Sequence, residues 1–252
     1  MQKFSPTKDF YDLLQELYYI FNKELFEDKL PNCLITVQRR KKVMGYFSAN
    51  RWVNDKKIQV HELALNPTYF ASCNFIELFQ TIVHEMCHLW QFEYGKPSIK
   101  TYHNKEWANK MESIGLIPSS TGRIGGKKTG QFMNDYPERG GIFENLCIRL
   151  FKEDMFIKWF DRFPQEIYHN NNLENPDSNN KINDIILESL YTPVSNVVVD
   201  IVSIEEIKAL NLSKQKTKYL CPNCKSAVWG RNNLNIKCNS CQVDFKIVSN
   251  QD

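Results

Sequence analysis

The sequence predicts an α+β fold, in which helices pack on a small antiparallel sheet and a separate cysteine-rich unit follows. Two long segments, 5–26 and 74–94, repeat apolar residues at helical spacing. Short runs of β-type residues lie between them, at 34–38, 45–49 and 57–65. Near the C-terminus, four of the 8 cysteines occur as two closely spaced pairs, which indicates a second small unit.

The composition is that of a globular protein, because 42% hydrophobic and 13% aromatic residues are too many for a disordered chain. The net charge of +3 neither demands nor excludes a polyanionic partner. The N-terminus lacks the apolar region of a secretory signal, and no run of about 18 apolar residues occurs. We therefore expect a cytoplasmic protein without a membrane partner, whose thiols favour metal ions over disulfides.

The first long segment predicts an amphipathic helix. Ser5 can cap this helix, and Pro6 suits its first position. Its buried stripe is formed by Phe10, Leu13, Leu14, Leu17, Phe21 and Leu25. Short polar connections, such as "RRKK" at 39–42, join the three β-type runs that follow. The simplest arrangement of these runs is an antiparallel three-stranded sheet.

The second long segment predicts a helix that begins at a capping box, because Asn74 is followed three residues later by Glu77. The stretch "YGKP" at 94–97 ends this helix. A further helix is expected at 104–115, with Gly115 as its C-terminal stop. Its buried face is formed by Trp107, Met111 and Ile114.

These elements divide the chain into four parts. Residues 1–121 form the main domain, and residues 122–165 form an ordered extension that could close over it as a lid. Residues 166–215 include "HNNNLENPDSNNK", which indicates an asparagine-rich linker with weak secondary structure. Residues 216–249 form the cysteine-rich unit.

The second helix carries His84, Glu85 and His88 in the stretch "QTIVHEMCHLW". At about 100° per residue, the two histidines lie about 40° apart on the helix surface, so both can bind one zinc ion. Glu85 projects to the flank, where its carboxylate can take a proton from a water molecule that the zinc activates. The alternative is two histidines on a half-buried helix without a chemical role. The apolar residues around the motif favour the metal site, since buried imidazoles need partners.

A catalytic zinc site usually has a third protein ligand. The pattern HExxHxxGxxH does not occur here, because Gln91 and Tyr94 stand in place of its glycine and last histidine. His103 is the better candidate, since it directly precedes the expected helix at 104–115, which can aim it. A site without a third ligand is an alternative. The remaining candidates are two acidic residues and two histidines, namely Glu106, Glu112, His61 and His169.

Five stretches within residues 10–120 carry a family resemblance: "FNKELFEDKLPN", "GYFSANRW", "ALNPTYF", "HEMCHLWQ" and "YHNKEWANKMESIGLIP". Their order and the spacing from His88 to His103 resemble SprT-like metalloproteases, a family that includes the DNA-dependent protease Spartan. The resemblance implies a minimal zincin-type protease domain with His84, His88 and His103 as zinc ligands and Glu85 as general base. Family members often have glycine before the third histidine. Tyr102 stands there in this chain, which could alter the approach to the metal or let a phenol reach the oxyanion.

The C-terminal cysteines predict a structural zinc site, because two CxxC pairs at this spacing supply four thiolates and leave no open position. A unit this small depends on the metal for its stability. A redox dithiol is the alternative, which the paired arrangement argues against. Several SprT-like proteins carry such a zinc ribbon behind the protease domain. The ligands are Cys221, Cys224, Cys238 and Cys241, whereas Cys33, Cys73, Cys87 and Cys147 are expected to be small core residues.

Basic residues crowd the ribbon and alternate with aromatic ones, which suits the phosphates and unpaired bases of single-stranded or flexible DNA. The alternative is a solvated basic face with Trp229 as the only core residue of the ribbon. The candidate DNA contacts are Lys216, Lys218, Tyr219, Trp229 and Arg231, with Lys214, Lys225 and Lys237 nearby.

Together these patterns predict a zinc-dependent endopeptidase with two zinc ions per chain, one catalytic and one structural. By resemblance, its substrates are proteins bound or crosslinked to DNA. One alternative is a non-catalytic nucleic-acid-binding module in which both zinc ions are structural, against which Glu85 argues because a structural site has no use for a carboxylate beside the metal. The other alternative is a zinc hydrolase that cleaves a bond other than the peptide bond.

Overall fold

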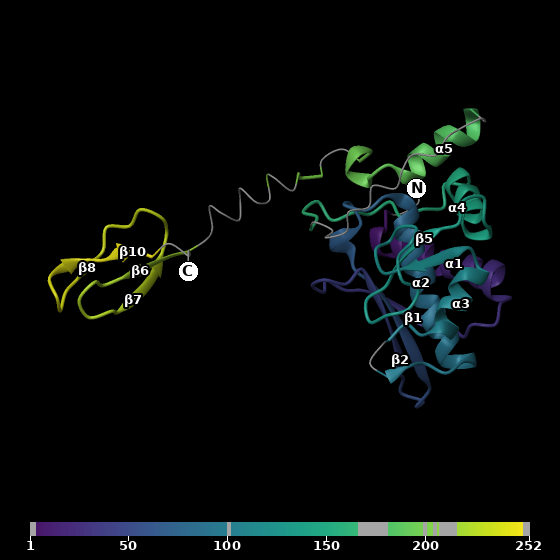
Figure 1. The fold of residues 1–252 in the computed structure, drawn as a ribbon, viewed down its shortest axis with the longest axis horizontal. Helices are drawn as coiled ribbons and strands as arrows, with labels where there is room; N and C mark the ends of the chain where they lie inside the picture. Colours follow the sequence, from purple (N-terminus) through teal and green to yellow (C-terminus); the bar gives the residue numbers. More distant parts are fainter. Residues whose placement is uncertain are drawn as a thin grey trace. The chain divides into compact units, whose positions relative to one another are not determined.

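This computed structural model of the chain describes residues 4–99, 102–165, 181–198, 201–203, 206 and 216–248. They belong to two compact units, Met1–Ile201 and Val202–Asp252 (Figure 1). The first unit combines helices with two small sheets, so the predicted α+β class is confirmed.

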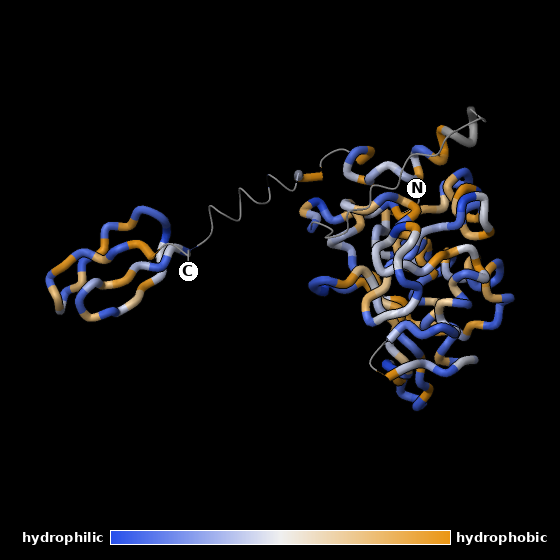
Figure 2. Tube along the Cα trace, viewed as in Figure 1, coloured by the Kyte–Doolittle hydropathy of each residue, from blue (hydrophilic) through white to orange (hydrophobic). Residues whose placement is uncertain are grey.

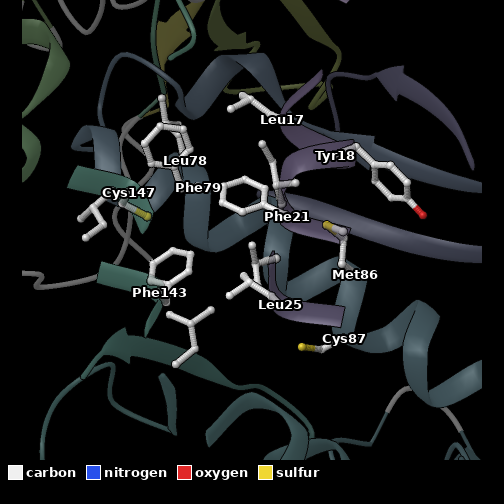
Figure 3. Close-up of a cluster of buried hydrophobic side chains, with 14 of the residues drawn as sticks. Leu17, Tyr18, Phe21, Leu25, Leu78, Phe79, Met86, Cys87, Phe143 and Cys147 are labelled. Atoms are coloured by element: carbon white, nitrogen blue, oxygen red, sulfur yellow. The ribbon is translucent and has the colours of Figure 1, made fainter. Parts of the chain in front are cut away.

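The first helix, α1 (Pro6–Phe26), buries the predicted apolar face in the core of the first unit. Phe21 lies at the centre of that core (Figure 3). Its ring centre is 5.8 Å from that of Phe79 in α2 (Phe75–Tyr94) and 6.4 Å from that of Phe143 in α4 (Ile142–Lys152). Pro6 occupies the first helical position as expected, but the side chain of Ser5 makes no capping hydrogen bond.

The main sheet has the strand order β1-β3-β2, formed by β1 (Cys33–Val37), β2 (Gly45–Val53) and β3 (Gln59–Leu65). β2 and β3 are antiparallel, whereas β1 and β3 are parallel, so the prediction of a wholly antiparallel sheet is wrong for this pair. β3 is the most buried of the three strands and takes the central position. It therefore separates β1 from β2, although these two are consecutive in the sequence.

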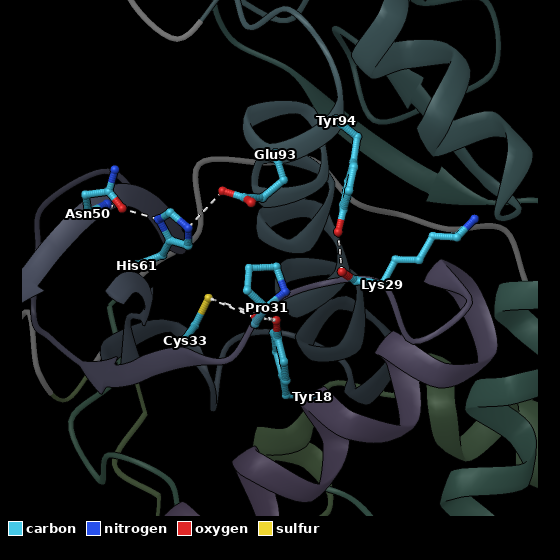
Figure 4. A network of polar contacts seen from close by, with 8 residues as sticks. All are labelled: Tyr18, Lys29, Pro31, Cys33, Asn50, His61, Glu93 and Tyr94. Carbon is cyan, nitrogen blue, oxygen red and sulfur yellow. Dashed lines mark hydrogen bonds and ion pairs between the residues drawn. The ribbon is translucent and has the colours of Figure 1, made fainter. Parts of the chain in front are cut away.

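His61, on the central strand, already has hydrogen-bond partners on both ring nitrogens (Figure 4). The backbone N–H of Asn50 donates to His61 Nδ1 at 3.0 Å, and His61 Nε2 lies 3.1 Å from a carboxylate oxygen of Glu93. These contacts connect β2, β3 and the last turn of α2. His61 is therefore part of the connection between sheet and helix.

α2 begins at the predicted capping box. The side chain of Asn74 accepts a hydrogen bond from the backbone of Glu77, whose carboxylate accepts one from the backbone of Asn74. Before it, a short 3-10 helix, η1 (Pro67–Tyr69), is capped by Asn66. After it, α3 (Lys105–Ser113) is capped by Asn104. Gly115 adopts a left-handed φ of +81° just beyond α3, as expected of a helix stop.

The predicted extension at 122–165 supplies a strand and a helix to the first unit. β5 (Asn134–Pro137) pairs antiparallel with β4 (Leu116–Ser119), and α4 follows. Cys147 and Leu150 of α4 are fully buried, so this part of the extension belongs to the core. Its closure over the site as a lid stays a prediction.

Part of the predicted linker also packs on the first unit. α5 (Lys181–Tyr191) and the 3-10 helix η3 (Val194–Asn196) bury Leu190 and Val194. The backbone N–H of Val194 donates to the carbonyl of Cys73 at 2.9 Å, which ties this segment to the start of α2. The sequence predicts this segment as linker, but its apolar side chains pack on the core of the first unit. The asparagine-rich stretch at 166–180 and residues 207–215 lie outside the described residues.

The described part of the second unit consists of short strands. β6 (Thr217–Leu220) lies between β7 (Ala227–Gly230) and β10 (Lys246–Ile247), and β8 (Lys237–Cys238) pairs with β9 (Val243–Asp244). Hydrophilic and hydrophobic residues are interspersed along both units (Figure 2). Every helix in the described residues is too short or too polar to span a membrane.

Candidate metal centre

The two histidines of α2 lie side by side on one face of a helix that is otherwise largely buried. His84 and His88 are one helical turn apart, and their ring centres are 5.2 Å apart. Both are half-buried, while the residues between them pack into the core. The sequence prediction that both imidazoles can face one metal ion agrees with this geometry.

His103 joins this pair from the segment that precedes α3. Its Nε2 atom lies 3.1 Å from Nε2 of His88. The Gln91 side chain, near the end of α2, donates to Asn104 Oδ1 at 2.7 Å and to a carboxylate oxygen of Glu106 at 2.9 Å. Because these bonds tie α2 to the first turn of α3, they fix the position of His103 between the two helices.

The Nδ1 atoms of His84 and His103 each contact a hydrogen-bond acceptor that lies later in the chain. His84 Nδ1 is 2.9 Å from Asp135 Oδ2, and His103 Nδ1 is 3.1 Å from the carbonyl oxygen of Gly130. His103 and Gly130 also exchange two backbone hydrogen bonds, at 2.9 and 3.1 Å. A histidine that donates through Nδ1 presents the lone pair of Nε2 to a metal ion, which is the usual arrangement around bound zinc.

The three histidines fit a zinc ion. One ring nitrogen from each lies within 4.8 Å of those from the other two. At a zinc–nitrogen distance of about 2.0–2.1 Å, two tetrahedral ligands are about 3.4 Å apart. The 3.1 Å between the Nε2 atoms of His88 and His103 is close to this value. Three protein ligands leave one tetrahedral position for water or substrate. We call His84, His88 and His103 the histidine cluster.

Trp107 of α3 packs against all three rings of the histidine cluster. The centre of its ring lies 4.9 Å from that of His84, 5.3 Å from that of His88 and 4.4 Å from that of His103. Its ring is nearly parallel to that of His88, and the whole side chain is buried. Trp107 therefore forms an apolar wall that holds the imidazoles in place.

Burial and mutual proximity keep two of the histidines neutral. Burial lowers the pKa of His88 well below its usual value, and the neighbouring His84 and His103 lower it further. Burial also lowers the pKa of His103 to about 4. Burial disfavours the charged form of His84 as well, but hydrogen bonding to Asp135 and the charge of Glu85 outweigh it and raise its pKa. Neutral imidazoles at His88 and His103 can bind a metal without first losing a proton.

Comparison with known protein families assigns the part of the chain that contains this site. The SprT-like family model matches residues 14–123, which contain the histidine cluster and Glu85. Residues 14–123 are a SprT-like domain. The resemblance seen in the sequence over residues 10–120 is thus confirmed, and the domain is of the metalloprotease type.

A second comparison finds a curated protein that is similar to part of this chain. A Salmonella typhimurium protein, described as "Uncharacterized protein in mucB 3'region", is 52% identical to this chain over 48 residues. The match covers 19% of this chain and 65% of that protein, so the chain spans less than two thirds of the relative's length. No solved structure matches the chain.

Glu85 lies beside the histidine cluster of the SprT-like domain and is 7% exposed. Burial raises the pKa of its carboxyl to about 7, against the opposing effects of His84 and of a backbone hydrogen bond from Phe47. β2 approaches α2 closely here. A Cβ added at Gly45 would lie 3.3 Å from Glu85 Cγ and 3.0 Å from Thr81 Cγ2. Glycine at this position lets the strand lie directly against the Glu85 side chain.

The other candidates for a third ligand are placed elsewhere in the SprT-like domain. Glu106 accepts hydrogen bonds from Gln91 and from the backbone of Lys96, and Glu112 pairs with Lys128. Neither acid belongs to the group of converging ligand atoms. Tyr102 is exposed next to His103. Of the remaining histidines, His61 is bonded to Asn50 and Glu93, and His169 lies outside the described residues.

The isolated cysteines are core residues, as predicted. Cys87 and Cys147 lie among apolar side chains in the core (Figure 3). Burial raises the pKa of both thiols well above the usual value, so they are protonated at neutral pH. Cys33 and Cys73 are also buried and free.

The paired cysteines converge as the sequence predicts. One sulfur atom from each of Cys221, Cys224, Cys238 and Cys241 lies within 4.8 Å of the others, and all four are free thiols. The sulfur atoms of Cys224 and Cys238 are 3.7 Å apart. Two thiolates at about 2.3 Å from a tetrahedral zinc ion would be about 3.8 Å apart. The second unit is thus compatible with a zinc ribbon. We call these four residues the cysteine cluster.

The two aromatic residues of the ribbon have opposite environments. Tyr219 is 1% exposed, and its hydroxyl donates to the carbonyl of Arg231 and accepts from the backbone of Leu234. Its prediction as a DNA contact is wrong, because its ring packs inside the ribbon. Trp229 is 60% exposed, with Nζ of Lys218 at 5.7 Å from its ring centre. Trp229 is therefore not the core residue of the ribbon.

The remaining predicted DNA contacts are exposed or half-buried. Lys216, Arg231, Lys225 and Lys237 are exposed, Lys218 is half-buried, and Lys214 lies outside the described residues.

Sequence patterns do not indicate Asp135 and Gly130, the two acceptors that support the histidine cluster. They lie in the extension, 51 and 27 residues from the histidines that they contact. No local pattern relates positions so far apart. The sequence predicts Trp107 only as a core residue, although its place three residues after Asn104, close to the third histidine, is a signal for a position at the site.

Proposed function

We propose that this chain is a zinc-dependent endopeptidase of the SprT type that acts on proteins bound or crosslinked to DNA. The observation that supports this most directly is the histidine cluster with Glu85 beside it on α2, inside a SprT-like domain. A buried carboxylate next to three converging imidazoles is the group that hydrolysis requires and that a purely structural site does not need.

The histidine cluster would hold a zinc ion, which when bound polarises the peptide carbonyl and acidifies a water molecule. Glu85 accepts the proton of the attacking water and returns it to the nitrogen of the leaving amine. The contact of β2 with α2 at Gly45 limits where the Glu85 side chain can lie. Glu85 is thereby kept close to the histidines, and the peptide is cleaved between its carbonyl carbon and nitrogen.

The cysteine cluster would hold a second zinc ion with a structural role, which gives two ions per chain. Four thiolates complete its coordination, so a chelator removes this ion more slowly than the ion of the histidine cluster. Zinc content and the rate of its loss to chelator therefore test this assignment.

The ribbon would contact DNA through exposed and half-buried side chains. Trp229 is available for stacking on an unpaired base, and Lys218 lies beside its ring. Lys216 and Arg231 are exposed on the same small unit and can bind phosphates. These features favour single-stranded or flexible DNA over a regular duplex.

The test is cleavage of a DNA-binding protein, with and without DNA, by the wild type, Glu85→Gln and Glu16→Gln. Glu16 is exposed on α1, so its substitution controls for the same chemical change away from the site. A general base contributes about 10²–10⁴-fold to the rate, so Glu85→Gln should lower cleavage by at least about 100-fold. Glu16→Gln should cleave as the wild type does.

Each outcome bears on a different part of the proposal. Cleavage that needs both Glu85 and DNA supports the whole of it. Cleavage that needs Glu85 but is indifferent to DNA keeps the endopeptidase and removes the role of DNA. If wild type and Glu85→Gln both bind DNA and neither cleaves protein, the chain is a non-catalytic nucleic-acid-binding module.

A further inference from the structure

The geometry points to Asp135 as the positioning residue of the metal centre, which holds His84 in the orientation and tautomer that bind zinc. This inference rests on the proposed function in one respect, that His84 is a zinc ligand. Asp135 lies on β5, outside residues 14–123 that match the family. It would therefore extend the working metal centre beyond the matched domain.

Each carboxylate oxygen of Asp135 contacts a side chain of α2. Oδ2 lies 2.9 Å from His84 Nδ1, and Oδ1 accepts a hydrogen bond of 2.8 Å from Nε2 of Gln80. Gln80 Nε2 also lies 3.1 Å from the backbone carbonyl of Asp135. Gln80 stands on α2 one turn before His84, so α2 holds the carboxylate at two points. The Asp135 side chain is 6% exposed, and water does not compete freely for these bonds.

The carboxylate determines which nitrogen of His84 carries the proton. An ionised carboxylate only accepts hydrogen bonds, so the facing Nδ1 must donate. Nε2, on the other edge of the ring, is then left with its lone pair for a metal ion. The reverse tautomer would place the lone pair of Nδ1 against the carboxylate, which is unfavourable in a buried site. Asp135 thus selects the form of His84 that can bind metal.

Gln80 donates to Asp135 although its own side-chain oxygen is left without a hydrogen-bond partner in the described part of the chain. Its side-chain oxygen is buried and has no hydrogen-bond partner among the described residues. Rotating the amide by half a turn would direct this oxygen at the carboxylate of Asp135 and remove the hydrogen bond. The amide therefore keeps its donor on Asp135 while its oxygen stays without a partner. The carboxylate is consequently held through Oδ1 by Gln80 as well as through Oδ2 by His84.

The Nδ1 contacts of His84 and His103 differ in kind, because one acceptor is a side-chain carboxylate and the other is a backbone carbonyl. Its Nδ1 contacts the carbonyl of Gly130, which any residue at that position would provide. The contact of His84 depends on the side chain of Asp135 and can be changed by one substitution. Hydrogen bonds of this kind typically change metal affinity by about 10–100-fold.

The test measures zinc affinity of the full-length protein by competition with a chromophoric chelator. The variants are Asp135→Asn, Asp135→Ala, the reference His84→Ala and the control Asp154→Asn. Asp154 pairs with Lys158 on the surface, so its change removes a carboxylate charge away from the metal centre. The tighter cysteine cluster serves as an internal control, because none of these substitutions touches it.

Asp135→Ala should weaken zinc binding at the histidine cluster by about 10–100-fold, and Asp135→Asn should act in the same direction at the lower end of that range. Asp154→Asn should bind as the wild type does. The urea midpoint of the metal-free protein separates positioning from folding. A positioning role requires that Asp135→Asn loses zinc affinity while that midpoint stays at the wild-type value, and a purely structural role would lower both.

The two proposals fail in different ways. If the wild type binds zinc at the cysteine cluster alone, or His84→Ala retains both ions, His84 is not a ligand and the proposed function fails. If the wild type binds two ions, His84→Ala binds one, and both Asp135 variants keep wild-type affinity, the role of Asp135 is overturned alone. If Asp135→Ala does not fold, Asp135→Asn decides the question.

Discussion

Replacing Trp107 by phenylalanine removes part of the wall against which the histidine cluster packs. The substitution deletes three ring atoms from a fully buried side chain. It breaks no hydrogen bond, because Trp107 Nε1 has no partner among the described residues. At about 0.8 kcal/mol per buried methylene-sized group, the lost burial is worth about 2 kcal/mol. A residual cavity adds to this and relaxation reduces it, so a loss of about 1–3 kcal/mol is expected.

Urea denaturation, followed by the circular dichroism of the helices, measures this loss. The matched control is Trp159→Phe, because Trp159 is 42% exposed and undergoes the same chemical change. Surface substitutions usually alter stability by less than about 0.5 kcal/mol. For a unit of this size, the loss at Trp107 corresponds to a melting temperature lower by about 2–12 °C.

Zinc binding provides a second readout for Trp107→Phe. All three imidazoles lose part of the surface that restricts their motion, so the variant should release the zinc of the histidine cluster to a chelator faster than the wild type does. Release from the cysteine cluster should not change. Equal losses of stability in Trp107→Phe and Trp159→Phe, or unaltered zinc release from the histidine cluster, would contradict this role of Trp107.

Two further predictions concern the cysteine cluster and Glu106. Cys238→Ser removes one of four thiolates, so zinc content should fall by about one ion per chain and the amide spectrum of the ribbon should lose dispersion, with the helical signal intact. A variant with unchanged zinc content would exclude Cys238 as a ligand. At Glu106, a backbone hydrogen bond from Lys96, with a smaller effect of Gln91, lowers the carboxyl pKa. A lowered folded-state pKa stabilises the protein above the unfolded value of about 4.3, and this stability is lost as the pH falls through the folded value. Glu106→Gln should therefore lose less stability than the wild type between about pH 6 and about pH 3, and an identical loss in the two proteins would contradict this role of the hydrogen bond.

The elements that the sequence predicts well are those that depend on neighbours within a few residues. The capping box of Asn74 and Glu77 and the spacing of His84 and His88 are set by one or two helical turns. The two CxxC pairs are equally local. By contrast, the parallel pairing of β1 with β3 depends on which strand takes the centre of the sheet, which no short pattern encodes.

Burial in the ribbon also depends on distant contacts. Tyr219 and Trp229 are both aromatic residues on strands and look alike in the sequence. The tyrosine can be buried because its hydroxyl forms hydrogen bonds with the backbone of Arg231 and Leu234, more than ten residues further along the chain. Trp229 faces solvent beside Lys218.

The spacing of the metal centre along the chain has a consequence for biosynthesis. His84 and Asp135 are 51 residues apart, with His103 and Gly130 between them. At about 5–20 residues per second, a ribosome needs roughly 3–10 s to proceed from the first of these positions to the last. During this interval the helix with its two histidines has been made, but its supporting strand has not. Until β5 has been made and pairs with β4, His84 lacks its contact with Asp135, so the histidine cluster is completed only late in the synthesis of the first unit.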